Sequence, residues 1–185
     1  MKNTIKYLIL LIIYLVCGVN LQAQNYTFRN VVMSDGLSGL LVNAIYKDSE
    51  GFVWLGTDNC LDRFDGVKVR HYEFRGVDSG RKKRVNCITE TADNQLWVGN
   101  GIGLWRLNRA NGQLERIVPE KIDFAVNTLL PDGDILYIGT AKGLFIQEDG
   151  QLLQVLTDRN MLAACNRIMD LCLNEDKSAL WLATV

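Results

Sequence analysis

The sequence is poor in the residues on which many enzymes and extended proteins depend. Its 185 residues include a single histidine, two prolines and five cysteines, none of them in a C-x-x-C pair. One histidine leaves little room for a histidine-based metal site or a catalytic triad. Lysine and arginine (20) balance aspartate and glutamate (21), so no surface for nucleic acid is expected. The sequence therefore predicts no catalytic residues, no metal site and no cofactor.

The composition is otherwise that of an ordinary globular protein. Hydrophobic residues make up 48% of the chain and charged residues 22%. These fractions exclude a disordered or low-complexity protein and indicate a packed core.

The first residues have the layout of a secretory signal peptide. Two lysines precede an apolar run at residues 7–19, and Ala23 is a small residue suited to cleavage. The run is too short to span a membrane, which takes roughly 20 apolar residues. An uncleaved anchor stays an alternative, because Leu21 is larger than the residue preferred two positions before the cut. We expect a signal peptide at residues 1–23 and a periplasmic or otherwise exported protein.

Export would leave four cysteines in the mature protein. They are Cys60, Cys87, Cys165 and Cys172. Three disulfide pairings are open to them, and the sequence does not choose between these. The alternative is that Cys87 and Cys172 are small, buried apolar residues.

A repeat of about 42 residues organises the rest of the chain. Similar segments begin at Val42, Val85, Val126 and Ile168, which lie 43, 41 and 42 residues apart. Each contains β-rich runs, such as FVWLG, QLWVG, ILYIG and ALWLA, bounded by turn residues. We predict an all-β fold over residues 24–185, an incomplete β-propeller with about three and a half four-stranded antiparallel blades. Residues 158–173 fit helical spacing about as well, but the repeat favours a strand from Ile168.

The second strand of each unit pairs a large ring with a missing side chain. Trp54 and Gly56 are two residues apart and therefore share one face of their strand. The pair recurs as Trp97 with Gly99, Tyr137 with Gly139, and Trp181 with Ala183. We expect blades that stack face to face, each ring lying on a neighbour's glycine. Two-residue hairpins are expected at Asp65-Gly66, Asn111-Gly112 and Asp149-Gly150.

One segment resembles a known family. The run SDGLSGLLVNAIYKDSEGFVWLGTDNCLDRFDG, residues 34–66, resembles the opening blade of the two-component regulator propellers. These are extracytoplasmic sensor regions of hybrid two-component systems, abundant in polysaccharide-degrading gut bacteria. The V-x-x-I start, the aromatic-x-G-T strand, the following G-L and the D-G or N-G hairpin carry the resemblance. The sequence departs from the pattern at Cys60 and Ala183, where glycine is expected.

The resemblance implies a function. The chain is expected to be the N-terminal part of a periplasmic ligand-sensing propeller that recognises an extracellular oligosaccharide or polysaccharide fragment. Relatives are much longer and carry a kinase module, so we expect a truncated product or fragment that is not itself an enzyme. The resemblance also implies a homodimer in a full-length relative. The alternatives are a secreted propeller lyase or hydrolase, against which the single histidine argues, and an interaction propeller without a small ligand.

The candidate ligand-binding residues lie in loops on one predicted rim of the propeller. Loops on a rigid scaffold commonly carry binding residues. A run of four basic residues suits an acidic or sulfated glycan, although such a run is also typical of a solvated loop. The predicted binding residues are Asp58, Asn59, Arg81, Lys82, Lys83, Arg84, Asn100 and Lys142.

Overall fold

The structure is a computed structural model that describes residues 5–7, 28, 30–77, 83–117, 122–156 and 167–185. It divides into two units, Met1–Asn30 and Val31–Val185. The predicted signal peptide lies in the first unit and, apart from residues 5–7, outside the described residues. Within the described ranges, no helix is both long and apolar enough to cross a membrane.

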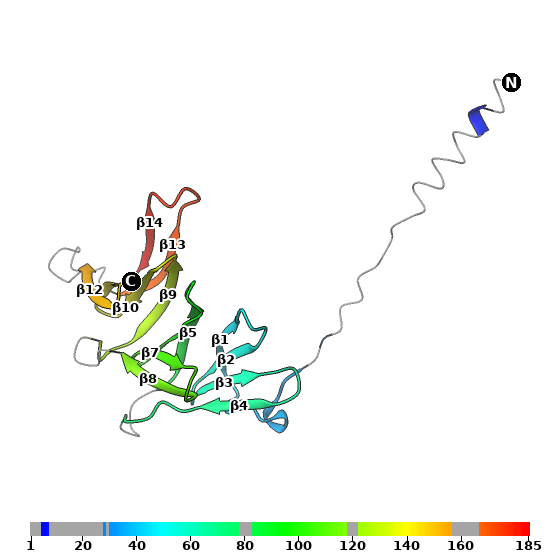
Figure 1. The fold of residues 1–185 in the computed structure, drawn as a ribbon, viewed down its shortest axis with the longest axis horizontal. Coiled ribbons are helices and arrows are strands. Elements are labelled where there is room, and N and C mark those ends of the chain that lie inside the picture. Colours follow the sequence, from blue (N-terminus) through cyan, green and yellow to red (C-terminus); the bar gives the residue numbers. More distant parts are fainter. Residues whose placement is uncertain (1–4, 8–27, 29, 78–82, 118–121, 157–166) are drawn as a thin grey trace. The chain divides into compact units, whose positions relative to one another are not determined.

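The second unit consists of four antiparallel sheets, which we call blades 1 to 4 (Figure 1). A short 3-10 helix, η1 (Met33–Asp35), precedes them. Blade 1 contains β1 (Val42–Lys47), β2 (Val53–Thr57), β3 (Leu61–Phe64) and β4 (Val69–Tyr72). Blade 2 contains β5 (Val85–Glu90), β6 (Leu96–Asn100), β7 (Gly103–Asn108) and β8 (Gln113–Ile117). Blade 3 contains β9 (Val126–Asp132), β10 (Ile135–Thr140), β11 (Gly143–Glu148) and β12 (Gln151–Leu156), and blade 4 contains β13 (Ile168–Leu173) and β14 (Leu180–Thr184).

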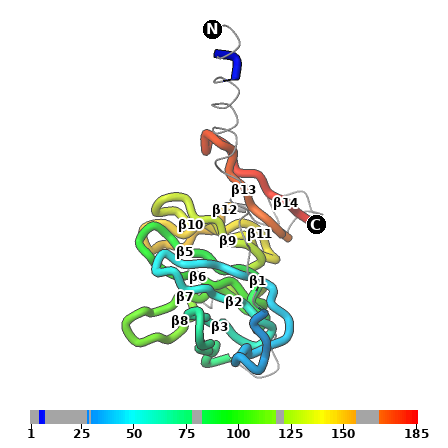
Figure 2. The backbone as a smooth tube through the Cα atoms, turned by 90° about the vertical axis from the view of Figure 1, so that its right-hand side faces the viewer, coloured from blue at the N-terminus to red at the C-terminus, as the bar shows by residue number. Residues whose placement is uncertain are grey.

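This arrangement confirms the predicted incomplete propeller. In each sheet the strands pair in chain order, and the first strands β1, β5, β9 and β13 contact one another in succession. Figure 2 shows the sheets following one another through the second unit. The segment from Ile168 is a strand, as the repeat favoured, while residues 157–166 of the alternative helix lie outside the described part.

Only one of the three predicted two-residue hairpins has that form. Asp149 and Gly150 both have positive φ, 49° and 74°, and directly join β11 to β12. The loops at residues 65–68 and 109–112 are four residues long, with positive φ only at their glycines among the described values. Those two predictions are wrong because Asp65 and Asn111 keep negative φ, which a longer loop permits.

Each hydrophobic core lies between two consecutive blades. The first core joins blade 1 to blade 2, and Trp54 and Val85 are completely buried in it. At this interface the rings of Phe74 and Trp105 meet edge to face, with centroids 5.0 Å apart. Two further cores join blade 2 to blade 3 and blade 3 to blade 4. A strand such as β2 is covered on both faces, which explains why its sequence is apolar on both.

The repeated glycines are required by the next blade's first strand. A Cβ on Gly56 would lie 2.5 Å from Cγ1 of Val85, far inside van der Waals contact. A Cβ on Gly99 would lie 2.6 Å from Val126 Cγ1, and one on Gly139 would lie 2.7 Å from Ile168 Cγ2. The first strand of the same blade is closer still at these two glycines, with Cys87 Sγ at 2.4 Å and Thr128 Cγ2 at 2.5 Å. The prediction that a neighbour's aromatic ring lies on each glycine is therefore wrong: a β-branched side chain fills the space.

The aromatic ring beside each glycine is buried only where another blade follows. Trp54 is 0% exposed and donates from Nε1 to Asp48 Oδ2 at 2.8 Å. Trp181 occupies the same register in blade 4 and is 68% exposed. Burial of the ring thus depends on the neighbouring sheet rather than on its own blade.

We expect the two tryptophans to differ strongly in their contribution to stability. Trp54→Ala should lower the free energy of unfolding by about 3–5 kcal/mol, because it opens a cavity between blades. It also leaves the buried Asp48 carboxylate without its indole donor. Trp181→Ala is the matched control and should cost about 0.5 kcal/mol or less. Urea unfolding followed by circular dichroism measures both values, and equal losses would contradict the interblade packing.

The described cysteines occupy different environments and are all free thiols. Cys60 is buried, Cys87 is half-buried and packs against the core between blades 2 and 3, and Cys172 is exposed. The interpretation of Cys172 as a buried residue is therefore wrong, while Cys165 lies outside the described residues. Burial raises the pKa of the Cys87 thiol from 9.0 to about 12, although a hydrogen bond from the Gly99 backbone opposes the shift.

We expect alkylation to distinguish Cys87 from Cys172. At about pH 8, iodoacetamide should label Cys172 rapidly and leave Cys87 unmodified until urea unfolds the chain, because the thiolate is the reactive form. The same pKa shift makes stability depend on pH. The Cys87 thiol has a pKa of 9.0 in the unfolded chain and of about 12 in the folded one, so only the unfolded chain gains the thiolate between these values. The free energy of unfolding should therefore fall as the pH rises from 9.0 towards 12. Peptide mapping by mass spectrometry identifies the labelled residue. Labelling of both cysteines at similar rates in the folded chain would overturn this expectation.

Candidate functional site

The loops between second and third strands are fastened to the residue that precedes each first strand. Gly101 N–H donates to the Arg84 carbonyl at 3.1 Å, and Ala141 N–H donates to the Ala125 carbonyl at 2.9 Å. In blade 4, Val185 N–H donates to the Arg167 carbonyl at 3.2 Å. These repeated bonds place Arg84, Ala125 and Arg167 at equivalent points on one rim of blades 2, 3 and 4.

The second residue of each first strand is a β-bulge. In blade 1, Val42 pairs with Thr57 and Ala44 pairs with Gly56, so Asn43 has no partner in the ladder. The same register shift occurs at Asn86, Asn127 and Met169. A bulge bends its strand and redirects a side chain, and here it releases three asparagine amides from the regular alternation.

Two of the bulge asparagines bridge consecutive blades. Asn86 Nδ2 donates to the Val126 carbonyl at 2.8 Å, and Asn127 Nδ2 donates to the Ile168 carbonyl at 2.7 Å. Asn43 Nδ2 instead donates to Asp58 Oδ1 within blade 1 at 2.9 Å. Sequence reasoning missed these residues, although the recurring Val-Asn at residues 42–43, 85–86 and 126–127 was a signal for them.

The rim positions and the bulges together line a cleft of about 520 Å³. The lining residues are Asn43, Arg84, Asn86, Gly101, Ala125, Asn127, Arg167 and Met169. Two arginines and three asparagines are therefore among the lining residues, and no aspartate or glutamate is among them. A carboxylate, that of Asp58, is bonded to the lining residue Asn43 at the blade 1 end. The cleft is a polar site whose charge favours an anionic group near the two arginines.

The structure brings one of the predicted binding residues, Arg84, into this cleft. Asp58 lies beside it through Asn43, and Lys83 is half-buried next to Arg84 in the chain. Arg81 and Lys82 fall outside the described residues.

The other predicted residues serve the loops themselves. Asn59 donates from Nδ2 to the Ser38 carbonyl at 2.8 Å, and Lys142 lies with Nζ 4.9 Å from the centroid of the Phe124 ring.

Asn100 differs from the rim surface position expected for it, because it is 0% exposed at the end of β6. Its Oδ1 accepts from Ile102 N–H at 3.0 Å and from Trp105 Nε1 at 3.2 Å. These bonds make it a residue that shapes its loop. A ligand-binding role for the other predicted residues stays a prediction.

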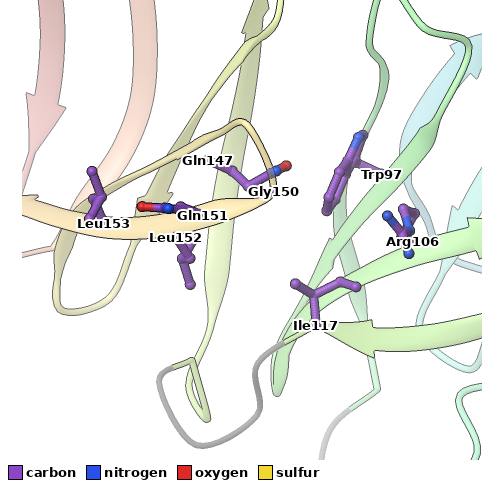
Figure 3. Close-up of a pocket in the computed structure, with 8 residues that line it drawn as sticks. All are labelled: Trp97, Arg106, Ile117, Gln147, Gly150, Gln151, Leu152 and Leu153. Carbon is purple, nitrogen blue, oxygen red and sulfur yellow. The ribbon is translucent and has the colours of Figure 1, made fainter.

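A second cleft of 500 Å³ separates blade 2 from blade 3. Figure 3 shows Trp97, Arg106 and Ile117 of blade 2 facing residues of the β11–β12 hairpin across it. Arg106 lies over the Trp97 ring at 5.8 Å and pairs with Glu115 at 3.6 Å. Trp97 is only 5% exposed, so little of its ring is available for stacking on a ligand. The rim cleft is therefore the stronger candidate site.

Comparison with known proteins finds a match to a propeller repeat and a partial match to a curated protein. The model of the two component regulator propeller family matches residues 36–59. The chain is 32% identical over 79 residues to Histidine kinase P4 of Formosa agariphila, an alignment that covers 43% of the chain and 6% of that protein. A match to 6% of a histidine kinase does not make this chain a kinase.

Solved structures share the fold. The extracellular domain of the hybrid two component system BT3049 from B. thetaiotaomicron has a TM-score of 0.70 and 20% identity, with 85% of this chain and 24% of that chain covered. The extracellular domain of the hybrid two component system BT4673 from the same organism has a TM-score of 0.67 and 23% identity, with 80% of this chain and 21% of that chain covered. The chain thus spans less than a quarter of these domains. The family model thus matches one repeat of this chain, and the solved structures share its propeller fold, as the repeats predicted.

Proposed function

We propose that this chain is the ligand-sensing part of an exported hybrid two-component sensor, and that its rim cleft binds a carbohydrate carrying an anionic group. The composition of the cleft is the observation that carries the proposal. Arg84 and Arg167 supply guanidinium groups, and the asparagine amides supply paired donors and acceptors. Guanidinium forks bind carboxylate and sulfate groups in a bidentate manner, while amides suit the hydroxyl groups of a sugar.

The resemblance to sensors of polysaccharide-degrading bacteria supports a carbohydrate as the ligand class. It also supports an extracytoplasmic location reached through the predicted signal peptide at residues 1–23. The solved neighbours are described as extracellular domains, which agrees with this location. A secreted propeller enzyme is not favoured, because the matched family and the solved neighbours are regulator and sensor propellers.

The position of the cleft suggests how binding is communicated. Its lining residues come from all four blades, and two of them, Asn86 and Asn127, form the bonds that join one blade to the next. A ligand that contacts these amides would bind one relative placement of the blades more tightly than others. Such a difference in affinity is what allows a ligand to shift the populations of two conformations. We extend the proposal to a full-length relative, in which such a change would act across a homodimer.

Binding experiments with matched oligosaccharides test the proposal. We expect uronate-containing or sulfated oligosaccharides to bind more tightly than neutral ones of the same length, as measured by calorimetry at constant salt. Arg84→Gln and Arg167→Gln should each weaken binding of the acidic probes by about tenfold or more, because each removes a charge-assisted hydrogen bond. Arg75→Gln alters an exposed arginine that does not line the cleft, and it should leave binding unchanged.

Asp58→Asn supplies the opposite test. It removes the negative charge at the blade 1 end and keeps an oxygen that can accept from Asn43, so it should strengthen binding of the acidic probes. Equal affinity for acidic and neutral probes, or no effect of either cleft arginine, would overturn the proposal.

A further inference from the structure

Three potential metal ligands converge on the face of blade 1 that points away from blade 2. Asp62 on β3 is 0% exposed, and its Oδ1 lies 2.7 Å from Nδ1 of His71 on β4. Cys60, just before β3, directs Sγ to the same oxygen at 3.2 Å. The three donor atoms all lie within 4.8 Å of one another. In the part of the chain that the structure describes, this is the sole cluster of three or more such ligands.

The cluster is a product of strand register. Asp62 and His71 are directly paired across β3 and β4. Leu61 and Tyr72, the alternate residues, face the core shared with blade 2. Because side chains alternate along a strand, Cys60, Asp62 and His71 project from the opposite face.

The other blades do not repeat the cluster. The positions equivalent to Cys60 and Asp62 hold Gly103 and Trp105 in blade 2. Trp105 pairs with Arg116 across β7 and β8, where Asp62 pairs with His71 in blade 1. Blade 1 therefore combines the chain's single histidine, His71, with Asp62 and with Cys60, which stands where the repeat has glycine.

The second carboxylate oxygen is held by other groups, as in the outer shell of a metal site. Ser38 donates to Asp62 Oδ2 from its backbone N–H at 2.8 Å and from Oγ at 2.7 Å. Ser38 Oγ also lies 2.9 Å from Thr57 Oγ1, which accepts from Cys60 N–H at 3.1 Å. These bonds fix the carboxylate so that Oδ1 is directed to the sulfur and the imidazole, and such outer partners orient ligands.

We propose that Cys60, Asp62 and His71 form a binding site for a zinc-class divalent cation. Thiolate sulfur, imidazole nitrogen and carboxylate oxygen are the ligand types of Zn²⁺, which is commonly held by three protein ligands and one open position. Ligand distances of about 2.0–2.3 Å require donor atoms a little over 3 Å apart. Here Asp62 Oδ1 lies 2.7 Å from His71 Nδ1 and 3.2 Å from Cys60 Sγ, and all three donor atoms lie within 4.8 Å of one another. The proposal departs from the sequence prediction of no metal site, which assumed that no histidine lies near a cysteine.

Charge and proton balance suit the same ion. On binding, the thiol proton leaves to solvent and the neutral imidazole carries its proton on Nε2, leaving Nδ1 free for the ion. One thiolate and one carboxylate then neutralise a divalent charge, which lowers the cost of burying it. His71 is 47% exposed, so the ion enters past the imidazole and water completes its coordination.

Titration of the whole chain with Zn²⁺ and Co²⁺ tests the proposal. We expect one equivalent of Zn²⁺ to bind in calorimetry, and Co²⁺ to give a thiolate-to-metal charge-transfer absorption band. Cys60→Ser and His71→Gln should each weaken Zn²⁺ binding at least about tenfold. The glutamine of His71→Gln can still donate a hydrogen bond to Asp62. Weaker Zn²⁺ binding by this variant would therefore reflect loss of the imidazole ligand and not loss of the hydrogen bond. The unfolding midpoint of each apo variant establishes that it is folded.

Cys172→Ser is the matched control, since it removes an exposed thiol outside the cluster and should leave binding unchanged. The absence of stoichiometric binding, or of a thiolate band in the wild-type chain, would overturn the proposal. So would binding that survives both Cys60→Ser and His71→Gln unaltered.

Discussion

The fold depends on the close approach between a glycine in the second strand of one blade and a β-branched residue at the start of the next. Gly56, Gly99 and Gly139 leave bare backbone on which Val85, Val126 and Ile168 rest. These contacts bring the sheets close together, and the aromatic rings of Trp54, Trp97 and Tyr137 lie beside the glycines. Each blade is consequently stabilised by its neighbour, as in other repeat proteins.

The same packing determines where functional side chains lie. The residue after each β-branched contact is the bulge, and its amide reaches the carbonyl of the next blade at Val126 and Ile168. This bond and the contact beneath it bring the rim positions of successive blades together, which forms the cleft around Arg84 and Arg167. The proposed sensing role requires a binding site that depends on blade placement, and a cleft lined by residues that form interblade bonds meets that requirement.

The sequence predicts the blades well because their signals are local. Period, strand content and the aromatic-x-glycine pattern are properties of short segments, so the first strands begin at Val42, Val85, Val126 and Ile168 in agreement with the repeat. What fills the space above each glycine depends on the offset between two sheets. That offset is not a property of either segment, so an aromatic ring was expected where a β-branched side chain lies.

The candidate sites were less predictable for a related reason. Arg84 and Asn100 were both expected on the rim because both lie in loops that the repeat places there. Arg84 does line the rim cleft, whereas Asn100 is completely buried. The cluster of Cys60, Asp62 and His71 requires the β3–β4 register and the placement of Ser38, neither of which composition reveals. In both cases the decisive facts are which face a strand turns outward and what covers it.

A double-mutant cycle on Gly56 and Val85 tests the central claim most directly. Gly56→Ala places a methyl group 2.5 Å from Val85 Cγ1, and Val85→Ala removes that carbon. We expect each single change to lower the free energy of unfolding by about 1–3 kcal/mol, and the double variant to lose at least about 1 kcal/mol less than their sum. Losses that add within about 0.5 kcal/mol would show that the two residues do not meet across the blades, and would contradict this account.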